Sequence, residues 1–449
     1  MEELNRARSA WQQSLQRPRR SPQLGASADA TARVPSPYIP ARRSGSQVLE
    51  QLVPGAVVET PVGVCYVVEQ RYALEHAHGG TSVGRLLDHH PSLLAPFHPA
   101  SALEDCADFS TAAFLDTETT GLGGGAGVYA FMVGVGTFEA RPDTMQPGHM
   151  EYVVRQFFMR SPAEEPALLY ALGALLSERQ LMVSFNGRSF DLPLLRTRYA
   201  LNRALLPANL RRVPILQEGS PHLDLLLPAR RLWKRRLQSC RLVNLESAIL
   251  GLERSQDDVP GFLIPQLYVD YVRSGRAGEM QRVFYHNRED IVTTTALAQQ
   301  LCQAVNAPHA AESGLHGLDW VSLAQNYEQS NQPDAAERCY MQALDVLDQP
   351  SDQRLALQRL ATLLKRQQRW VDAAALWERW LTTVPGADAT PYIELAMYYE
   401  WKRQDLEQAE MWAAWGLHTI NSAPHWQRLP GQMANLEQRL QRIRRKRAA

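Results

Sequence analysis

The stretch TAAFLDTETT, residues 111–120, places two acidic side chains at the end of an apolar run. The apolar residues predict a buried β-strand that carries Asp116 and Glu118 to its open end. Side chains alternate between the two faces of a strand, so both carboxylates point the same way. Two adjacent carboxylates repel each other, and a hard divalent cation with oxygen ligands would stabilise the pair most simply.

Two further acidic motifs lie downstream. SFNGRSFD, residues 184–191, follows the apolar run LMV and predicts a strand, an Asn-Gly turn and a helix with Asp191 in its first turn. HNRED, residues 286–290, falls in a long helix predicted over about 277–303. His286 and Asp290 are four residues apart and therefore share a helix face, whereas Tyr285 is rotated off it.

The sequence around these motifs predicts an α/β domain over residues 110–303. VYAFMVGVGTF and MEYVVRQFFM are typical of strands, HLDLL of a short strand, and helices are expected near 163–178 and 189–202. Three early strands followed by alternating helices and strands indicate a mixed sheet with helices on its faces. GLGGGAG contains a G-x-G-x-x-A pattern, but a strand follows it where a dinucleotide-binding loop needs a helix.

The motifs DTETTGL, NGRSFD and HNRED resemble, in order and element type, the three exonuclease motifs of the DEDD (DnaQ-like) 3′–5′ exonucleases. Those enzymes have a ribonuclease H-like fold. The chain is more closely similar to the YprB-type branch of that superfamily, through the segments VVETPVG, HLDLL, ARRLW, CRLVNLE and PGFLIPQLYVDYVRSG. The resemblance covers about residues 50–303.

The resemblance implies a two-metal nuclease. Four carboxylates would hold two Mg²⁺ or Mn²⁺ ions that activate a water and stabilise the leaving 3′ oxygen. They correspond here to Asp116, Glu118, Asp191 and Asp290.

The resemblance also implies a general base and substrate contacts. His286 would orient or deprotonate the attacking water. The implied substrate-binding residues are Thr119, Leu122 and Asn186, with Leu122 as an apolar wedge against the terminal base. One feature departs from the family: its members have Tyr-x3-Asp or His-x4-Asp, whereas this chain has His-x3-Asp, with Tyr285 at the x4 spacing. Sharing a face with Asp290 favours His286 as the base.

The last third of the chain predicts a second, all-α domain. Ala324, Ala361 and Ala396 recur at intervals of 37 and 35 residues. Each unit has two apolar helical runs joined by a short polar turn, and small residues stand where paired helices must approach closely. The pattern resembles tetratricopeptide repeats, whose nominal period is about 34 residues, and implies a possible protein partner.

These patterns divide the chain into five predicted segments. The first segment, residues 1–46, carries eight Arg against three acidic residues. It predicts a disordered tail, because it can bury too little apolar area to offset the entropy lost on folding. The segments are a basic tail (1–46), a β-hairpin leader (47–109), a ribonuclease H-like exonuclease domain (110–303), tetratricopeptide-like repeats (315–420) and a basic helical tail (421–449).

Composition narrows the function classes. The 449 residues carry 47 Lys and Arg against 47 Asp and Glu, which excludes a uniformly basic DNA coat but permits local basic patches. Five Cys without a CxxC pair argue against a disulfide scaffold and indicate a reducing compartment, and we expect a cytoplasmic protein. We expect no membrane span, since no apolar run approaches about 18–20 residues.

Two clusters allow more than one interpretation. The basic stretch 230–241 around Trp233 is either a phosphate-tracking surface with a stacking aromatic or a solvated helix face with Trp233 in the core. His76, His78, His89 and His90 are irregularly spaced, and we expect surface-loop histidines rather than a metal site.

The sequence predicts a metal-dependent nuclease, acting as a 3′–5′ exonuclease on DNA or RNA. Two alternatives stay open. The first is a non-catalytic nucleic-acid-binding scaffold with a degenerate nuclease fold and partner-recruiting repeats. The second is endonuclease action with the same metals.

Overall fold

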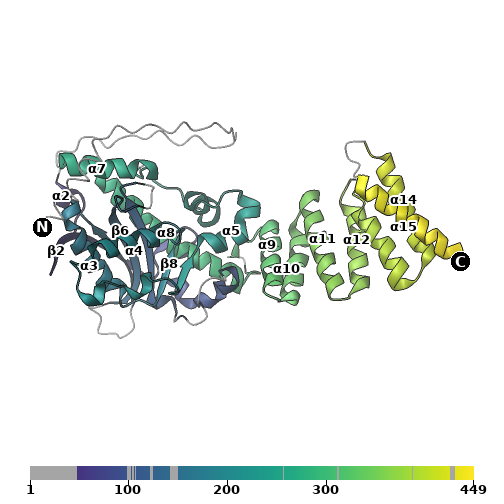
Figure 1. Cartoon of the computed structure of the whole chain (residues 1–449), viewed down its shortest axis with the longest axis horizontal. Coiled ribbons are helices and arrows are strands. Elements are labelled where there is room, and N and C mark those ends of the chain that lie inside the picture. Colours follow the sequence, from purple (N-terminus) through teal and green to yellow (C-terminus); the bar gives the residue numbers. More distant parts are fainter. Residues whose placement is uncertain are drawn as a thin grey trace. The chain divides into compact units, whose positions relative to one another are not determined.

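The computed structural model describes residues 48–98, 103, 106, 108–121, 125–141, 150–255, 257–310, 313–386, 388–424 and 430–448. The chain divides into two compact units (Figure 1). The first unit comprises Met1–Arg230 and Ser239–Ser313, and the second comprises Arg231–Gln238 and Gly314–Ala449. The predicted basic tail lies outside the described residues, and the five segment boundaries stay predictions.

A mixed sheet of seven strands is the centre of the first unit. Neighbouring strands pair antiparallel in the part of the sheet formed by β1, β2, β7, β6 and β5. The strands β8 and β9 extend the sheet beyond β5 with parallel pairing. In spatial order the seven strands are β1 Ala56–Thr60, β2 Gly63–Ala73, β7 Met150–Phe158, β6 Ala130–Ala140, β5 Ala112–Thr119, β8 Leu181–Ser184 and β9 His222–Asp224. The hairpin predicted in the leader is thus β1–β2, and its second strand joins the same sheet through β7.

Helices cover both faces of this sheet. Gly134 on β6 faces Asn287 of α8 (Met280–Asn306), so the neighbouring Val133 and Val135 point to the other face. There they share a hydrophobic cluster with Leu168 of α3 (Glu165–Leu176) and with apolar residues of α4 (Asp191–Asn202). The predicted α/β class, with a mixed sheet between helices, is the one observed.

Shorter elements complete the first unit. The strands β3 Ala77–His78 and β4 Thr81–Ser82 form a separate small sheet. The remaining α-helices and the π-helix η7 are α2 Leu49–Leu52, α5 Leu226–Leu237 (from Arg231 on in the second unit), α6 Leu242–Leu245, η7 Glu246–Leu250 and α7 Ile264–Ser274. The 3-10 helices are η1 Val83–Asp88, η2 Pro91–Phe97, η3 Phe109–Thr111, η4 Pro162–Glu164, η5 Ala208–Leu210, η6 Pro214–Leu216 and η8 Gly261–Leu263.

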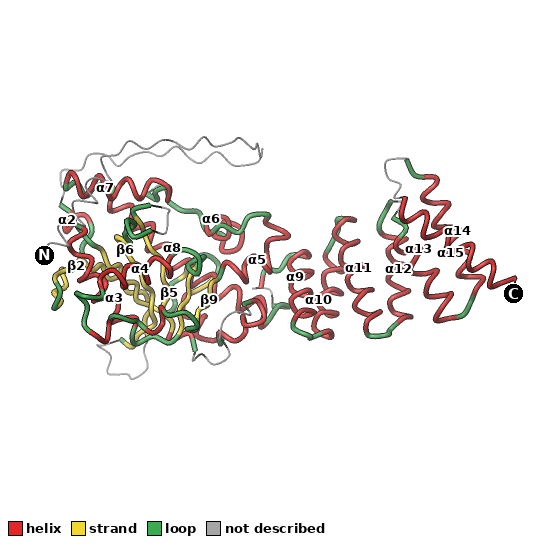
Figure 2. The backbone as a smooth tube through the Cα atoms, in the orientation of Figure 1, coloured by secondary structure: helices red, strands yellow, loops and turns green. Residues whose placement is uncertain are grey.

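The second unit is helical, and successive helices pack against each other (Figure 2). The alanines predicted at close helix contacts are buried, Ala324, Ala361 and Ala396 among them. Assignment of these helices to the tetratricopeptide family stays a prediction. They are α9 Gly317–Gln329, α10 Pro333–Val346, α11 Pro350–Arg366, α12 Trp370–Thr383, α13 Thr390–Tyr398, the π-helix η10 Tyr399–Arg403, α14 Leu406–Ser422 and α15 Pro430–Ala448.

Burial decides between the interpretations of the basic stretch around Trp233 and of the histidine cluster. Trp233 is buried, so it is a core residue and no stacking platform. The expectation of surface histidines is wrong for His78 and His89, which are buried because η1 and the β3–β4 sheet pack against α8. Across the described residues, no helix combines the length and the apolar character needed to cross a bilayer.

Candidate active site

Asp116 and Glu118 lie near the carboxyl end of β5. They are two residues apart, so strand alternation directs both side chains to the same face of the sheet. A register shift between Glu118 and Thr119 ends the regular pairing of β5 with β6 at this point. Such bulges end pairing and redirect side chains next to active sites. Asp116 is half-buried and Glu118 is buried, so both carboxylates are largely withdrawn from water.

Asn287 of α8 anchors Asp116. Its Nδ2 donates to Asp116 Oδ2 at 3.0 Å, and its Oδ1 accepts from Gln156 Nε2 at 3.0 Å. Gly134, paired with Asp116 across the β5–β6 ladder, makes room for this contact. A Cβ there would lie 2.3 Å from Asn287 Oδ1, so a larger residue would displace the amide.

Asp191 reaches the same end of the sheet from the turn between β8 and α4. Asn186 has φ +66°, and the amides of Asn186 and Arg188 donate to the Asp224 carboxylate at 2.7 and 3.1 Å. Asp191 begins α4, and Thr117 Oγ1 donates to its Oδ1 at 2.5 Å. Asp224, left open by the sequence as a supporting or a plain structural carboxylate, therefore fixes the turn that aims Asp191.

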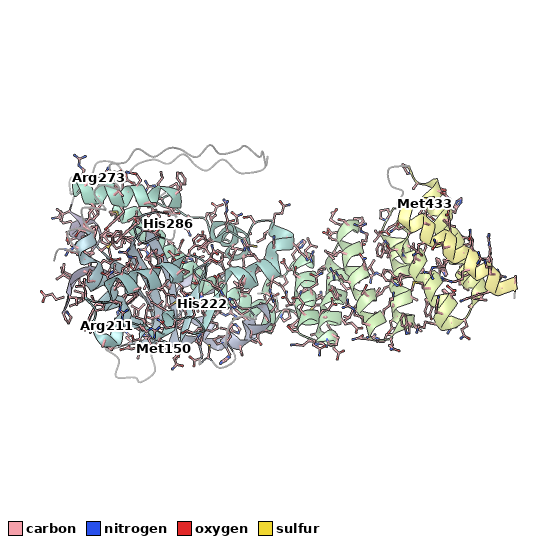
Figure 3. The ribbon with its side chains drawn as sticks, in the orientation of Figure 1. Met150, Arg211, His222, Arg273, His286 and Met433 are labelled. Carbon is pink, nitrogen blue, oxygen red and sulfur yellow. The ribbon has the colours of Figure 1, made fainter. Side chains whose placement is uncertain are left out.

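Gly187 is required in this turn. A Cβ at Gly187 would lie 2.5 Å from Ser184 Oγ and 3.0 Å from Asp191 Oδ2. Ser184 Oγ also lies 2.8 Å from Nε2 of His222, a residue of β9 inside the first unit (Figure 3). The Asn-Gly pair therefore supplies both the left-handed backbone and the space that the carboxylate needs.

His286 and Asp290 lie on one face of α8. His286 Nε2 is 3.7 Å from Asp290 Oδ2, and His286 Nδ1 is 2.7 Å from Asp258 Oδ1. Tyr285 lies elsewhere, with its ring 5.3 Å from the guanidinium carbon of Arg288. The imidazole is therefore held at Nδ1, and its Nε2 faces the acidic end of the sheet.

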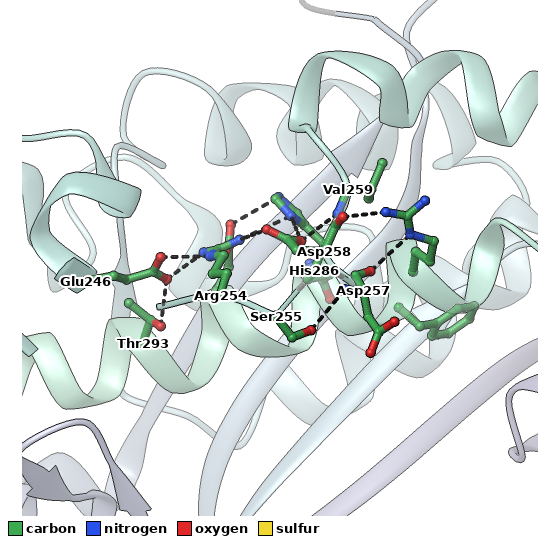
Figure 4. A network of polar contacts seen from close by, with 12 residues as sticks. Glu246, Arg254, Ser255, Asp257, Asp258, Val259, His286 and Thr293 are labelled. Carbon is green, nitrogen blue, oxygen red and sulfur yellow. Dashed lines mark hydrogen bonds and ion pairs between the residues drawn. The ribbon is translucent and has the colours of Figure 1, made fainter. Parts of the chain in front are cut away.

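Arg254 links three acidic residues beside His286 (Figure 4). Its guanidinium forms two hydrogen bonds with Glu246, at 2.6 and 2.7 Å, and pairs with Asp258 at 3.2 Å. It also forms an ion pair with Asp290 and lies 3.1 Å from His286 Nδ1.

The buried Glu246 is held from its other side as well. Thr293 Oγ1 donates to Glu246 Oε1 at 2.9 Å, and His78 Nε2 lies 2.9 Å from that hydroxyl. The network therefore reaches from His78, in the small β3–β4 sheet, to Asp290.

Comparisons with known proteins bear on the fold and the family of this chain. A family model described as "RNase_H superfamily" matches residues 113–302. The chain is 30% identical over 360 residues to the uncharacterized protein YprB of Bacillus subtilis (strain 168), covering 77% of this chain and 78% of that protein. The chain belongs to the YprB family of the ribonuclease H superfamily. The resemblance to the YprB-type branch and the ribonuclease H-like fold are both confirmed.

In this YprB-family chain, mutual repulsion and burial disfavour ionised carboxylates. Burial, followed by the charges of Asp290, Asp191 and Glu118, raises the pKa of Asp116 well above its usual value. Burial raises the pKa of Glu118 to about 7, against the lowering effect of His286 and Arg254.

The same cause acts on Asp191. Burial is again the main reason that its pKa is raised, to about 6, although the hydrogen bond from Thr117 lowers it. Three carboxyl groups from β5 and α4 thus share one electrostatic environment in which added positive charge would favour ionisation.

The donor chemistry of this site fits hard divalent cations. Four carboxylates, those of Asp116, Glu118, Asp191 and Asp290, supply the oxygen ligands that Mg²⁺ and Mn²⁺ prefer. Within the part of the chain that the structure describes, no three acidic, His or Cys side chains are already arranged as a coordination shell. The guanidinium of Arg254 forms an ion pair with the carboxylate of Asp290. For Asp290 to bind a metal ion, Arg254 would have to move away from that carboxylate.

Two of the three substrate-binding residues implied by the resemblance lie in the described part of the chain. Thr119 Oγ1 donates to the carbonyl of Gly121 at 2.8 Å and so shapes the loop after β5. Asn186 lies in the turn before α4, and its backbone is fixed by Asp224. Leu122 lies outside the described residues.

Sequence reasoning missed several residues of this site. Asn287 stands inside the HNRED motif, but nothing in the motif indicates a role for it. Arg254 and Asp258 lie in a segment with no strand alternation or helical period that would have placed them. Glu246 begins the π-helix η7, but its place in a helix does not indicate its partners. The one available signal was the density of charge in LERSQDD, residues 252–258, immediately before the apolar stretch of α7.

Proposed function

We propose that this protein is a metal-dependent nuclease that hydrolyses phosphodiester bonds from a 3′ end and releases nucleoside monophosphates. The observation that carries the proposal is the convergence of Asp116, Glu118, Asp191 and Asp290 at one end of a ribonuclease H-like sheet, where their charges act on one another. We place the activity in the cytoplasm, as the cysteine usage suggests.

The four carboxylates would hold two Mg²⁺ or Mn²⁺ ions. When bound, the ions supply Lewis acidity to the attacking water, the phosphate and the leaving 3′ oxygen. Asn287 keeps Asp116 in position, and Thr117 does the same for Asp191, so these ligands are oriented before the substrate arrives.

His286 would act on the attacking water. Asp258 accepts a hydrogen bond from Nδ1 and leaves Nε2, on the Asp290 side, as the proton acceptor. The water proton would pass to Nε2, the water oxygen would bond to phosphorus, and the bond to the 3′ oxygen would break. The leaving 3′ oxygen would then take a proton from solvent water.

The proposed base role of His286 depends on the charge of the carboxylates around it. Burial lowers its pKa, but Asp290, Asp258 and Glu118 together raise the pKa to about 10. An imidazolium cannot accept a proton, so the base role requires positive charge on those carboxylates, which the ions would provide.

The direction of attack is testable with end-labelled oligonucleotides. Wild-type protein with Mg²⁺ or Mn²⁺ should shorten 5′-labelled single strands one nucleotide at a time from the 3′ end. A covalently closed circle of the same sequence should stay intact, because it offers no 3′ end. Cleavage of the circle would replace this proposal by endonuclease action with the same metals.

A non-catalytic role is the second candidate, and the Arg254–Asp290 ion pair is the observation that favours it. A guanidinium on a metal-binding carboxylate is a feature expected of a degenerate site. In that case, wild-type protein would bind nucleic acid but leave DNA and RNA intact with every divalent metal.

A further inference from the structure

The second unit contains a cavity of about 170 Å³. None of the residues that line it belongs to the candidate active site. Its lining combines four aromatic side chains with two lysines and with Glu394, which forms an ion pair with Lys365. We call it the Trp401 pocket, after its exposed tryptophan; its aromatic lining residues are Trp370, Trp377, Tyr398 and Trp401, and its lysines are Lys365 and Lys402.

The aromatic faces of the Trp401 pocket carry cations. Lys402 Nζ lies 4.2 Å from the ring centroid of Trp370. Lys446 Nζ and the guanidinium carbon of Arg442 lie 5.1 and 5.7 Å from the ring centroid of Trp401. Trp401 is nevertheless 61% exposed, a large apolar surface left in water.

The backbone presents Trp401 and Lys402 in an unusual way. Both stand on the π-helix η10, which ends at Arg403 and is followed by Gln404 with φ +54°. Single π-helical turns are rare and are frequent at functional sites, since the extra residue changes the direction of the side chains around it. The wide turn thus brings a tryptophan and a lysine of adjacent sequence to the same cavity.

The neighbouring helix α15 adds positive charge. Its residues 430–448 carry six Arg or Lys and a single acid, Glu437. The buried Glu400 holds Arg442 and Lys446 beside Trp401, through oxygen–nitrogen distances of 2.6 and 2.8 Å. Glu400 and Glu410 together pair with five of the six cations of α15, so an excess of positive charge remains next to the exposed ring and suits a polyanion.

We propose that the Trp401 pocket binds a base of single-stranded nucleic acid while Lys402 and the basic side chains of α15 contact its phosphates. A cavity of about 150 Å³ accommodates one benzene ring, so the observed volume admits a planar heterocycle. Aromatic stacking together with a positively charged track is the usual mode of sequence-tolerant single-strand binding. On stacking, the cations over Trp401 would move to the adjacent phosphates.

This inference shares the nucleic-acid substrate of the proposed function but not its chemistry. A peptide of acidic residues alone, such as polyglutamate, offers the same charge without planar rings to fill an aromatic cavity. A base with its phosphate uses both the tryptophan walls and Lys402, which is why nucleic acid is favoured.

The test is fluorescence anisotropy of labelled single-stranded DNA and RNA oligonucleotides with full-length protein in EDTA, where a metal-dependent nuclease is silent. Trp401→Ala should weaken binding by about 5–100-fold. Lys402→Gln should reduce the slope of log affinity against log salt by about 0.7, the value for one single-strand phosphate contact. Trp415→Ala is the matched control: Trp415 is half exposed in α14 but lies outside the pocket lining.

Wild-type affinity in Trp401→Ala and Lys402→Gln, with circular dichroism unchanged, would overturn the proposal. Trp401-dependent binding of polyglutamate in place of the oligonucleotides would overturn it in favour of an acidic peptide. If Trp401-dependent binding occurs and no metal supports hydrolysis, the pocket stands and the proposed nuclease activity fails. If wild type hydrolyses the oligonucleotides and Trp401→Ala binds them unaltered, the nuclease activity stands and the pocket fails.

Discussion

His286 Nδ1 lies 2.7 Å from Oδ1 of Asp258, although the two residues are 28 positions apart in the chain. Asp258 belongs to the segment between η7 and η8, whereas His286 stands on α8 beside Asp290. The contact fixes one ring nitrogen and leaves the other on the side of the acidic cluster. A histidine at an unusual motif spacing thereby has the orientation that the proposed base role requires.

Replacing His286 separates this account from one in which Tyr285 is the base. His286→Ala should lower kcat by about 10²–10⁴-fold, the usual range for loss of a general base. Tyr285→Phe should cost little, because its ring lies by Arg288, off the helix face that His286 shares with Asp290. Single-turnover rates on a 5′-labelled oligonucleotide provide the measurement. A crippled Tyr285→Phe beside an active His286→Ala would reverse the assignment.

Arg254 should matter for stability as well as for the site. Arg254→Met leaves the buried Glu246 without its cation, which costs about 3–5 kcal/mol when one partner of a buried pair is removed. Arg288→Met is the matched control, since Arg288 pairs with the adjacent Glu289 near the surface and should cost less than about 1 kcal/mol. Urea denaturation at neutral pH measures both. Equal losses would show that the Arg254 network does not stabilise the first unit.

Glu400 should make the second unit acid-sensitive. Despite its burial, hydrogen bonds and charges from Arg442 and Lys446 lower its pKa from 4.5 to about 2. A lowered folded-state pKa contributes stability that is present above about pH 4.5 and is lost as pH falls toward about 2.

The comparison of wild type with Glu400→Gln isolates this effect. The variant should lose about 1–3 kcal/mol at pH 7, and the difference from wild type should vanish as pH falls through that window. Glu337→Gln, which breaks a surface pair with Arg369, should change stability by less than about 1 kcal/mol. A difference between wild type and Glu400→Gln that does not vary with pH would contradict the assignment.

Local rules were enough to place much of this candidate site. Strand alternation placed Asp116 and Glu118 on one face, and the helical period placed His286 beside Asp290. The Asn-Gly turn before Asp191 was equally readable.

Residues brought together by tertiary packing could not be read in this way. Asn287 contacts Asp116 because Gly134 clears its path, a fact that depends on strand register. Arg254 belongs to a segment without periodicity, and only the folded chain brings it to Asp290. His78 was expected in a surface loop, but packing of its small sheet against α8 buries it.

The metal dependence of hydrolysis tests the central claim most directly. Wild type, Asp116→Asn and Asp290→Asn should be incubated with 5′-labelled DNA and RNA in Mg²⁺, in Mn²⁺ and in EDTA. The account predicts cleavage by wild type only with divalent metal, and rates lowered by orders of magnitude in both folded variants. It also predicts that Mn²⁺ raises the thermal unfolding temperature of wild type more than that of Asp116→Asn. Full activity in EDTA, or full activity of Asp116→Asn, would contradict the two-metal account.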